Sequence, residues 1–433
     1  MGDSPKSILC DGRMRAGQWL AIIVTACLNA LDGFDVLSIS FASPGIAHDW
    51  GVDKATLGWA LSMELVGMAV GSVLLGGVAD RIGRRPTMLG CLIAMALGMY
   101  GAGHAGGIGV LLAWRLLTGL GIGGMLASTN AMAAEYSNDR WRNFAMALMV
   151  IGYPLGGVSG GLVVQRILAN GSWHQVFMFG SVATVSFVPV VWFLVPESVM
   201  FLDKQRAPGA LERINAILRR LGHPAASALS PLPAAAPHKS VLDILKPGLL
   251  GTTAMITFAY SAHIVSFYFI LKWVPKIVVD LGFAPKAAAG VLTWVNMGGA
   301  LGGAMFGVLA TRVGLKGLTV CALVGATLMV VWFGQGAADL SVLTTKATLA
   351  GLFNNAGIAG LYLLFARVFP THVRATGTGF AIGVGRGGAA LAPVIAGYLF
   401  QAGFGLALVA AAMGAGSLLA AVTLSLLKMR EVD

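Results

Sequence analysis

Residues 31–40 read LDGFDVLSIS and place two carboxylic acids, Asp32 and Asp35, inside a run that is otherwise apolar. Residues three apart in a helix occupy neighbouring positions on one face. Two close carboxylates do not both ionise cheaply, so one of this pair is expected to hold a proton near neutral pH. Acids inside apolar segments are usually functional, which favours proton coupling over a structural pair held by hydrogen bonds. Which acid takes the proton stays open.

Two arginines also lie within apolar runs. Arg115 is expected at a membrane depth similar to that of Asp32, so it either pairs with the aspartates or contacts a substrate. Arg386 lies among four glycines in GVGRGGAALAP, residues 383–393. A guanidinium with room around it can bind a carboxylate through two parallel hydrogen bonds. We therefore expect Arg386 to bind a substrate carboxylate; the alternatives are pairing with backbone carbonyls of the spans or a role in helix packing. We also expect the acids and arginines to face one aqueous pocket.

Other side chains in the apolar runs are weaker candidates for the same site. His263 titrates in a useful range but is equally well explained as a structural histidine. Asn354 and Asn355 suit either a substrate hydroxyl or a bridge between helices. The rings of Phe34 and Trp294 can stack on an aromatic substrate, although packing is the default role for each.

The composition indicates the kind of structural element that carries these acids, arginines and other candidate side chains. The 433 residues are 57% hydrophobic and 11% charged, with 60 glycines, whereas a soluble protein has about 25% charged residues. Such a chain is typical of a helical membrane protein, in which small residues let helices pack closely. No nucleophile–base set is evident and the four cysteines have no metal-ligand spacing, so we expect neither an enzyme nor a metal or cofactor.

Twelve apolar runs are each long enough to cross about 30 Å of hydrocarbon. The runs are 19–42, 55–78, 86–105, 108–134, 142–166, 173–195, 248–275, 286–310, 317–336, 343–368, 376–401 and 404–427. This order predicts an all-α protein with two six-helix bundles, 1–196 and 247–433. The linker between them, 197–246, is expected to be cytoplasmic and to contain an amphipathic helix at 210–222. Glu64, in the second run, has no partner that the sequence can name.

The basic residues fall mainly in alternate connections between the runs. Most of the 29 Lys and Arg residues lie on the side of the N-terminus, and an excess of Lys and Arg marks cytoplasmic loops. Both termini are therefore expected in the cytoplasm. The net charge of +11 is then explained by basic residues that set the orientation in the membrane, and binding to nucleic acid is not expected. The first run is interpreted as a retained span rather than a cleaved signal, because it carries two acids.

Two short connections repeat each other. GGVADRIGRR (76–85) and GVLATRVGLK (307–316) each follow the second run of their half, which indicates a duplicated bundle whose halves rock about a central site. The first copy resembles the loop motif of the major facilitator superfamily. The resemblance implies a charge network that closes the cytoplasmic side in one state. Its expected members are Asp80, Arg81, Arg84, Arg85 and, from the end of the fourth run, Glu135.

The whole chain is similar to the aromatic acid:proton symporter branch of that superfamily. The similarity rests on D-G-x-D at 32–35, the loop at 76–85, Arg115, the arginine in GRGGAALAP (385–393) and VPES (195–198). It implies import of an aromatic or related carboxylic acid with protons, by alternating access, across a bacterial inner membrane. We expect a monomer, with proton coupling at Asp32 and Asp35. The residues expected to bind the substrate are Phe34, Arg115, His263, Trp294, Asn354, Asn355 and Arg386. A proton-coupled drug or metabolite exporter and a non-transporting sensor of the same fold are the alternatives.

Overall fold

The computed structural model describes residues 4–230, 244, 246–370 and 373–427, and its regular elements in these ranges are helices. Twelve of the helices are long and apolar enough to cross a membrane. They are α2 (Ala16–Trp50), α3 (Lys54–Ile82), α4 (Arg84–Gly103), α5 (Ile108–Glu135), α6 (Arg142–Asn170), α7 (Trp173–Leu194), α10 (Pro247–Asp280), α11 (Pro285–Leu309), α12 (Leu315–Gly334), α13 (Leu340–Val368), α14 (Arg374–Gln401) and α15 (Leu406–Leu426). The predicted all-α architecture with twelve spans is confirmed.

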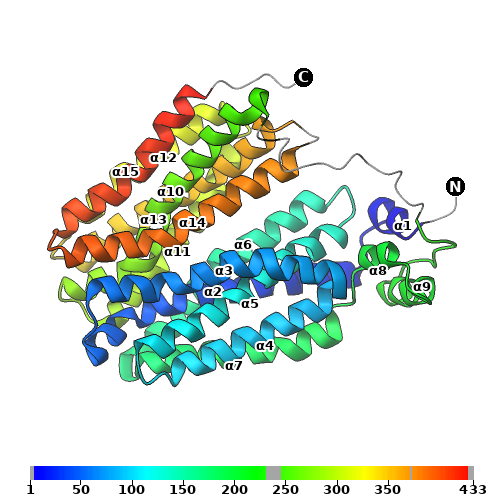
Figure 1. Cartoon of the computed structure of the whole chain (residues 1–433), viewed down its shortest axis with the longest axis horizontal. Helices are drawn as coiled ribbons and strands as arrows, with labels where there is room; N and C mark the ends of the chain where they lie inside the picture. The colour runs from blue at the N-terminus through cyan, green and yellow to red at the C-terminus, as the bar shows by residue number, and fades with distance from the viewer. Residues whose placement is uncertain (1–3, 231–243, 245, 371–372, 428–433) are drawn as a thin grey trace.

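The long helices form two groups, which we call the N-half (α2–α7) and the C-half (α10–α15). The halves touch through α3 with α14, α6 with α11, and α2 with α10 and α11. Figure 1 shows that they lie close together where α2 ends and lean apart toward the end where α2 begins. We call these two ends the closed end and the open end.

Glycines bring helices within each half into close contact. A Cβ atom at Gly33 of α2 would overlap the backbone oxygen of Tyr153 in α6, and one at Gly156 of α6 would overlap the backbone of Ala30. The same relationship holds in the C-half, where Gly302 of α11 faces the backbone of Leu352 in α13. Small residues allow this approach in membranes, where lipid supplies no hydrophobic drive for helix association.

Three short helices, α1 (Pro5–Asp11), α8 (Val199–Gln205) and α9 (Ala210–Leu221), lie at the open end beside the start of α2 (Figure 1). The helix expected at 210–222 is α9. It begins and ends at glycines with positive φ, Gly209 and Gly222, and it buries Ile214 and Leu218. The rest of the predicted linker includes residues 231–243 and 245, which lie outside the described residues, so the domain boundaries stay predictions.

The closed end is sealed by contacts between the halves. Trp59 donates its indole N–H to the Tyr398 hydroxyl at 3.5 Å, and the Lys54 ammonium lies 3.8 Å from the Asp280 carboxylate. Farther along, Gln165 of α6 donates to the Thr293 hydroxyl of α11 at 3.2 Å. Within the described ranges, the hydrogen bonds between the halves all lie from this end to the middle of the bundle. The structure is therefore closed at one end and open at the other.

Candidate substrate cavity and buried charge cluster

A cavity of ≈ 700 Å³ lies between the two halves. Apolar side chains and glycines form most of its wall, with polar groups from Asn29, Asn130 and Asn355 and from four tyrosines, Tyr153, Tyr260, Tyr268 and Tyr362. Arg386 is the only charged residue in the wall among the residues that the structure describes. An apolar cavity with a few convergent polar groups is the usual form of a small-molecule site.

Arg386 extends from α14 into this cavity. One of its N–H groups donates to the backbone oxygen of Met68 in α3 at 3.2 Å, which leaves the other donors of the guanidinium for a ligand. A Cβ atom at Gly383 or Gly387 would meet nothing within 4 Å, whereas Gly385 lies against the Tyr260 ring. Of these three glycines Gly385 is the one in the described cavity wall, and it lets the Tyr260 ring lie next to Arg386.

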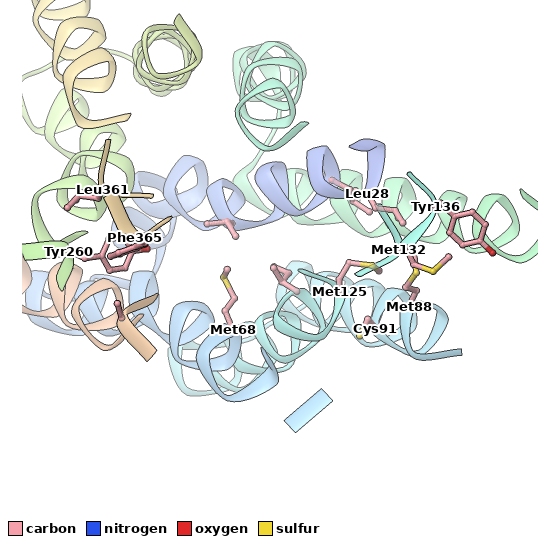
Figure 2. Close-up of a cluster of buried hydrophobic side chains, with 14 of the residues drawn as sticks. Leu28, Met68, Met88, Cys91, Met125, Met132, Tyr136, Tyr260, Leu361 and Phe365 are labelled. Carbon is pink, nitrogen blue, oxygen red and sulfur yellow. The ribbon is translucent and has the colours of Figure 1, made fainter. Parts of the chain in front are cut away.

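Aromatic side chains of the C-half gather next to Arg386. The Tyr260 and Tyr362 hydroxyls are 3.3 Å apart, and the Tyr260 and Phe365 rings meet edge to face with centroids separated by 5.5 Å. Figure 2 shows Tyr260 and Phe365 together, with Met68 between them and the methionines of the N-half. The cavity thus offers a cation for a carboxylate, with π-faces and hydroxyls for a ring.

His263 and Asn354 lie behind the cavity wall. His263 is fully buried, and both ring nitrogens are used: Nε2 donates to the Asn354 backbone oxygen at 2.9 Å and Nδ1 accepts from the Ser417 hydroxyl at 2.8 Å. The Asn354 amide donates to the Ala350 backbone oxygen at 2.8 Å. Of the two asparagines, Asn355 alone lines the cavity. These contacts fit the structural interpretation of His263, and its role at the substrate site stays a prediction.

The two aromatic candidates Phe34 and Trp294 are also absent from the described cavity wall. Phe34 is buried inside the N-half, against Gly160 and edge to face with Phe179 at 5.3 Å. Trp294 is 54% exposed on the outside of the helix bundle. In this state neither ring can stack on a molecule in the cavity.

Asp32 and Asp35 are fully buried inside the N-half and are not in the cavity wall. Their four carboxylate oxygens have no hydrogen-bond partner among the described residues. Asp35 faces α7: its carboxylate lies near Gly180 and beside the Thr184 hydroxyl, which donates to the Gly180 backbone oxygen instead. The expectation that the acids share the aqueous pocket with the arginines is therefore wrong for this state, because these faces of α2 point into the N-half.

Arg115 is fully buried as expected, but its ion pair is with Glu64 and not with an aspartate. The same guanidinium nitrogen donates to the backbone oxygen of Asp35 at 2.9 Å, and its Cζ lies 5.4 Å from the centre of the Phe177 ring. The expected pairing of Arg115 with the Asp32 and Asp35 carboxylates is therefore corrected: Arg115 reaches the main chain of α2, and its counter-ion comes from α3.

Lys272 of α10 completes the buried charges. Its ammonium lies 3.5 Å from Glu64 Oε2 and donates to the backbone oxygen of Val36 in α2. Both Lys272 and Glu64 are fully buried. Sequence reasoning left Glu64 unpaired and gave Lys272 no role. The signal was available, because Lys272 is an isolated cation within YFILKWVP (268–275) and such residues inside membrane spans are rarely incidental.

The loop motif at 76–85 forms its network inside the N-half. The Arg84 guanidinium lies 2.6 Å from Asp80 and 3.7 Å from Glu135. Arg85 lies over the Trp192 ring and donates to the Trp192 backbone oxygen, while Arg81 is exposed. In the described residues these groups make no hydrogen bond to the C-half, as befits an open end; their role as a gate stays a prediction.

Glu197 of the VPES stretch caps the helix that follows this loop. Its Oε1 accepts from the backbone N–H groups of Arg84 and Arg85 at 2.9 and 3.3 Å. A carboxylate at a helix N-terminus satisfies free N–H groups and interacts favourably with the helix dipole. Gly83 precedes the cap with φ of 111°, and a Cβ atom there would overlap Glu197. Ser198 links the same stretch to Glu135 through its hydroxyl.

Residues 25–334 match the family model described as Major Facilitator Superfamily. The chain belongs to this superfamily, and with its twelve apolar helices it is an integral membrane protein. Its relatives carry the names of transporters, which indicates a transporter rather than an enzyme.

Among these relatives is the "Gallate transporter" of Pseudomonas putida, 27% identical over 94% of this chain and 91% of the relative. The "4-hydroxybenzoate transporter PcaK" of the same organism is 28% identical over 86% of this chain and 84% of its own length. The "3-(3-hydroxy-phenyl)propionate transporter" of Escherichia coli is 29% identical over 93% and 92%.

Solved structures show the same fold. A D-xylose-proton symporter matches with a TM-score of 0.74 and 17% identity, over 94% of this chain and 97% of its own. The partially occluded inward-open conformation of the xylose transporter XylE from E. coli matches with a TM-score of 0.75 and 16% identity, over 96% and 99%. At these identities the similarity concerns the fold alone.

Proposed function

We propose that this protein imports an aromatic or related carboxylic acid into a bacterial cell, in symport with protons, by alternating access. The observation that carries the proposal is the cavity between the halves, where Arg386 is the one charged group in the described wall and Tyr260 and Tyr362 stand beside it. A guanidinium in an apolar, aromatic wall suits an organic anion with a ring. The names of the relatives, which are transporters of gallate, 4-hydroxybenzoate and 3-(3-hydroxyphenyl)propionate, support the same class of substrate.

The excess of basic residues on the N-terminal side supports an orientation in the inner membrane with both termini in the cytoplasm. In that orientation the open end faces the cytoplasm and the structure is the inward-facing state of a monomeric carrier. Asp32 and Asp35 remain our candidates for the proton-coupling acids, because they are buried ionisable groups without partners in the described part of the chain. The network of Asp80, Arg84 and Glu135 is then the cytoplasmic gate in its released form.

Purified protein in liposomes tests this function. Uptake of radiolabelled benzoate, 4-hydroxybenzoate, gallate and muconate is measured with and without an outside-acid pH gradient. We expect accumulation of at least one of these acids that depends on the gradient, and its loss in the double variant Asp32→Asn/Asp35→Asn.

Two results would contradict the proposal. Proton-driven movement of organic cations out of the liposomes, with no uptake of acids, would identify the drug exporter. Binding of an acid without flux would identify the sensor.

A further inference from the structure

Five buried ionisable groups form one cluster between the cavity and the closed end. Three are acids, Asp32, Asp35 and Glu64, and two are cations, Arg115 and Lys272, and all five side chains are fully buried. Glu64 joins the two cations directly, and the Asp35 backbone oxygen receives an Arg115 N–H. The cluster therefore has one more acid than it has cations.

This imbalance fixes the number of protons that the cluster holds. An unpaired charge buried in a protein costs several kcal/mol, so the cluster is most stable when its formal charges cancel. With both cations charged, two carboxylates are ionised and the third carries a proton. The other groups that face the acids are neutral: Cys91 of α4, Tyr153 of α6, Thr184 of α7 and Tyr268 of α10. Arg386 is not counted with the cluster, because in the described residues no hydrogen bond or ion pair joins it to an acid: it lines the cavity and donates to the backbone oxygen of Met68.

Lys272 differs from the other four members because it comes from the C-half. Asp32, Asp35, Glu64 and Arg115 all lie on N-half helices and stay together when the halves move as bodies. Lys272 reaches them only across the interface, through Glu64 and the Val36 backbone oxygen. Opening of the closed end separates these contacts. Three acids are then left with one cation, and neutrality requires two protons in place of one.

We propose that Lys272 is the coupling residue of this carrier: when the closed end shuts, its ammonium enters the acid cluster and displaces one proton, which leaves through the open end. When Lys272 withdraws, one of the acids takes up a proton from the opposite side. One proton therefore crosses the membrane in each cycle. This inference rests on the proposed function for its transport direction, and for a monocarboxylate it makes import electroneutral, because one anion and one proton move together.

The first experiment needs no substrate. Spin labels are placed at His48 and Lys286, exposed positions at the closed end in opposite halves, after the four native cysteines are replaced. Acid favours the two-proton cluster, so the distance between the labels is expected to lengthen as the pH falls. Lys272→Arg, which keeps the fixed charge, should behave like the parent, whereas Lys272→Gln should lose the pH response. Lys276→Gln is the matched control, because Lys276 lies one turn farther along α10 and pairs with Asp280.

The second experiment measures coupling in liposomes with radiolabelled 4-hydroxybenzoate. Each unit of pH gradient should support about tenfold accumulation, and an imposed membrane potential should add nothing. Lys272→Gln should still exchange labelled for unlabelled acid, which shows that it is folded, but accumulation should fall to equality across the membrane.

In the spin-label experiment, the inference is overturned if the distance in the parent does not change with pH, if Lys272→Gln keeps the pH response, or if Lys272→Arg loses it. In the transport experiment, it is overturned if Lys272→Gln still accumulates the acid or if membrane potential drives uptake. Failure of the proposed function looks different: the labels respond to pH as described while none of the aromatic acids is transported.

Discussion

The Lys272 ammonium of the C-half lies 3.5 Å from Oε2 of Glu64 in the N-half, and the same carboxylate oxygen is ion-paired with Arg115. One acid thus holds a cation from its own half and a cation from the other half, with all three side chains fully buried. The Arg115 contact joins two helices of the N-half, whereas the Lys272 contact joins the two halves and, in our proposal, is lost when the closed end opens. The stabilising contact of Glu64 with Arg115 and its contact with the proposed coupling residue Lys272 are therefore separable by mutating the two cations one at a time.

The pair of Glu64 and Arg115 is expected to contribute strongly to stability. Glu64→Gln leaves the buried Arg115 guanidinium without its counter-ion, which costs about 3–5 kcal/mol. Arg115→Gln leaves Glu64 with Lys272 as its remaining partner and should cost less. The double variant removes both charges, so its loss should be clearly smaller than the sum of the two. Thermal unfolding in detergent measures the loss of stability in the two single variants and in the double variant. The control is Asp80→Asn, which breaks a pair whose acid is 60% exposed and should change stability by less than about 1 kcal/mol. Additive losses would show that the buried pair is not coupled.

Arg386 is expected to set the affinity for the carboxylate. Arg386→Ala removes a charge-assisted bond worth about 1.5–3 kcal/mol, so the dissociation constant of a transported acid should rise about tenfold to a hundredfold. Arg386→Lys keeps the charge but cannot form two parallel hydrogen bonds, so its dissociation constant should lie between those of the parent and of Arg386→Ala. Equilibrium binding to the detergent-purified protein checks both. Arg166→Ala, at an exposed arginine of α6, serves as the control. Unchanged affinity in Arg386→Ala would move the carboxylate site elsewhere.

Gly33 is expected to be intolerant of any side chain. A Cβ atom there would overlap the main chain of Tyr153, which cannot move aside without shifting α6. Gly33→Ala should lower the melting temperature, although alanine is normally favoured over glycine within a helix by about 0.5–1 kcal/mol. Gly77→Ala is the matched control, because a Cβ atom at Gly77 of α3 meets nothing within 4 Å. That variant should melt at or above the parent temperature, and equal effects at both sites would contradict the close contact.

The docking of the short helix α9 is expected to weaken in acid. His223 follows α9 and donates from Nε2 to the Gln18 side-chain oxygen of α2 at 2.8 Å. Burial, and next the Arg15 charge, lower the pKa of His223 from its ordinary value of 6.5. The released imidazole therefore binds its proton at higher pH than the docked one. Docking is at full strength above pH 6.5 and is lost as the pH falls through the lowered pKa.

Hydrogen exchange of α9, corrected for the pH dependence of intrinsic exchange, measures this effect between about pH 7.5 and about pH 5.5. We expect protection to fall in acid in the parent and to stay constant in His223→Gln, whose amide can replace the donor without titrating. His48→Gln, at an exposed histidine of the closed end, should behave like the parent. An equal loss of protection in His223→Gln would exclude the histidine as the cause.

Hydropathy alone predicted the twelve spans, because the length and apolar content of a membrane helix are dictated by the bilayer. The depth of a residue along its helix was also predictable, and Arg115 does lie beside Asp35. The rotation of each helix about its axis was not, since a span that is apolar all round carries little periodic signal. For this reason the sequence did not show that Asp32 faces away from the cavity, or that Glu64 and not an aspartate meets Arg115.

The same limit explains the candidate substrate residues. Arg386 and Asn355 line the cavity, whereas Asn354, the immediate neighbour of Asn355, points elsewhere. Adjacent positions on a helix differ by about 100° in direction, so one of two neighbouring residues can line a site while the other points away from it. The partner of Lys272 could not be predicted for another reason: Glu64 is 208 residues away in the chain, and only the meeting of the two halves brings them together.

The cap that Glu197 places on α4 joins two stretches of sequence separated by more than a hundred positions. Gly83 leaves the space that the carboxylate occupies, and the carboxylate accepts from the backbone N–H groups of the next two residues, Arg84 and Arg85. Gly83 is therefore constrained twice, by this contact and by its φ of 111°. Across descendants of this chain, replacement of Glu197 removes the first constraint and leaves the second, so glycine at 83 should outlast the glutamate even where the transported compound has diverged.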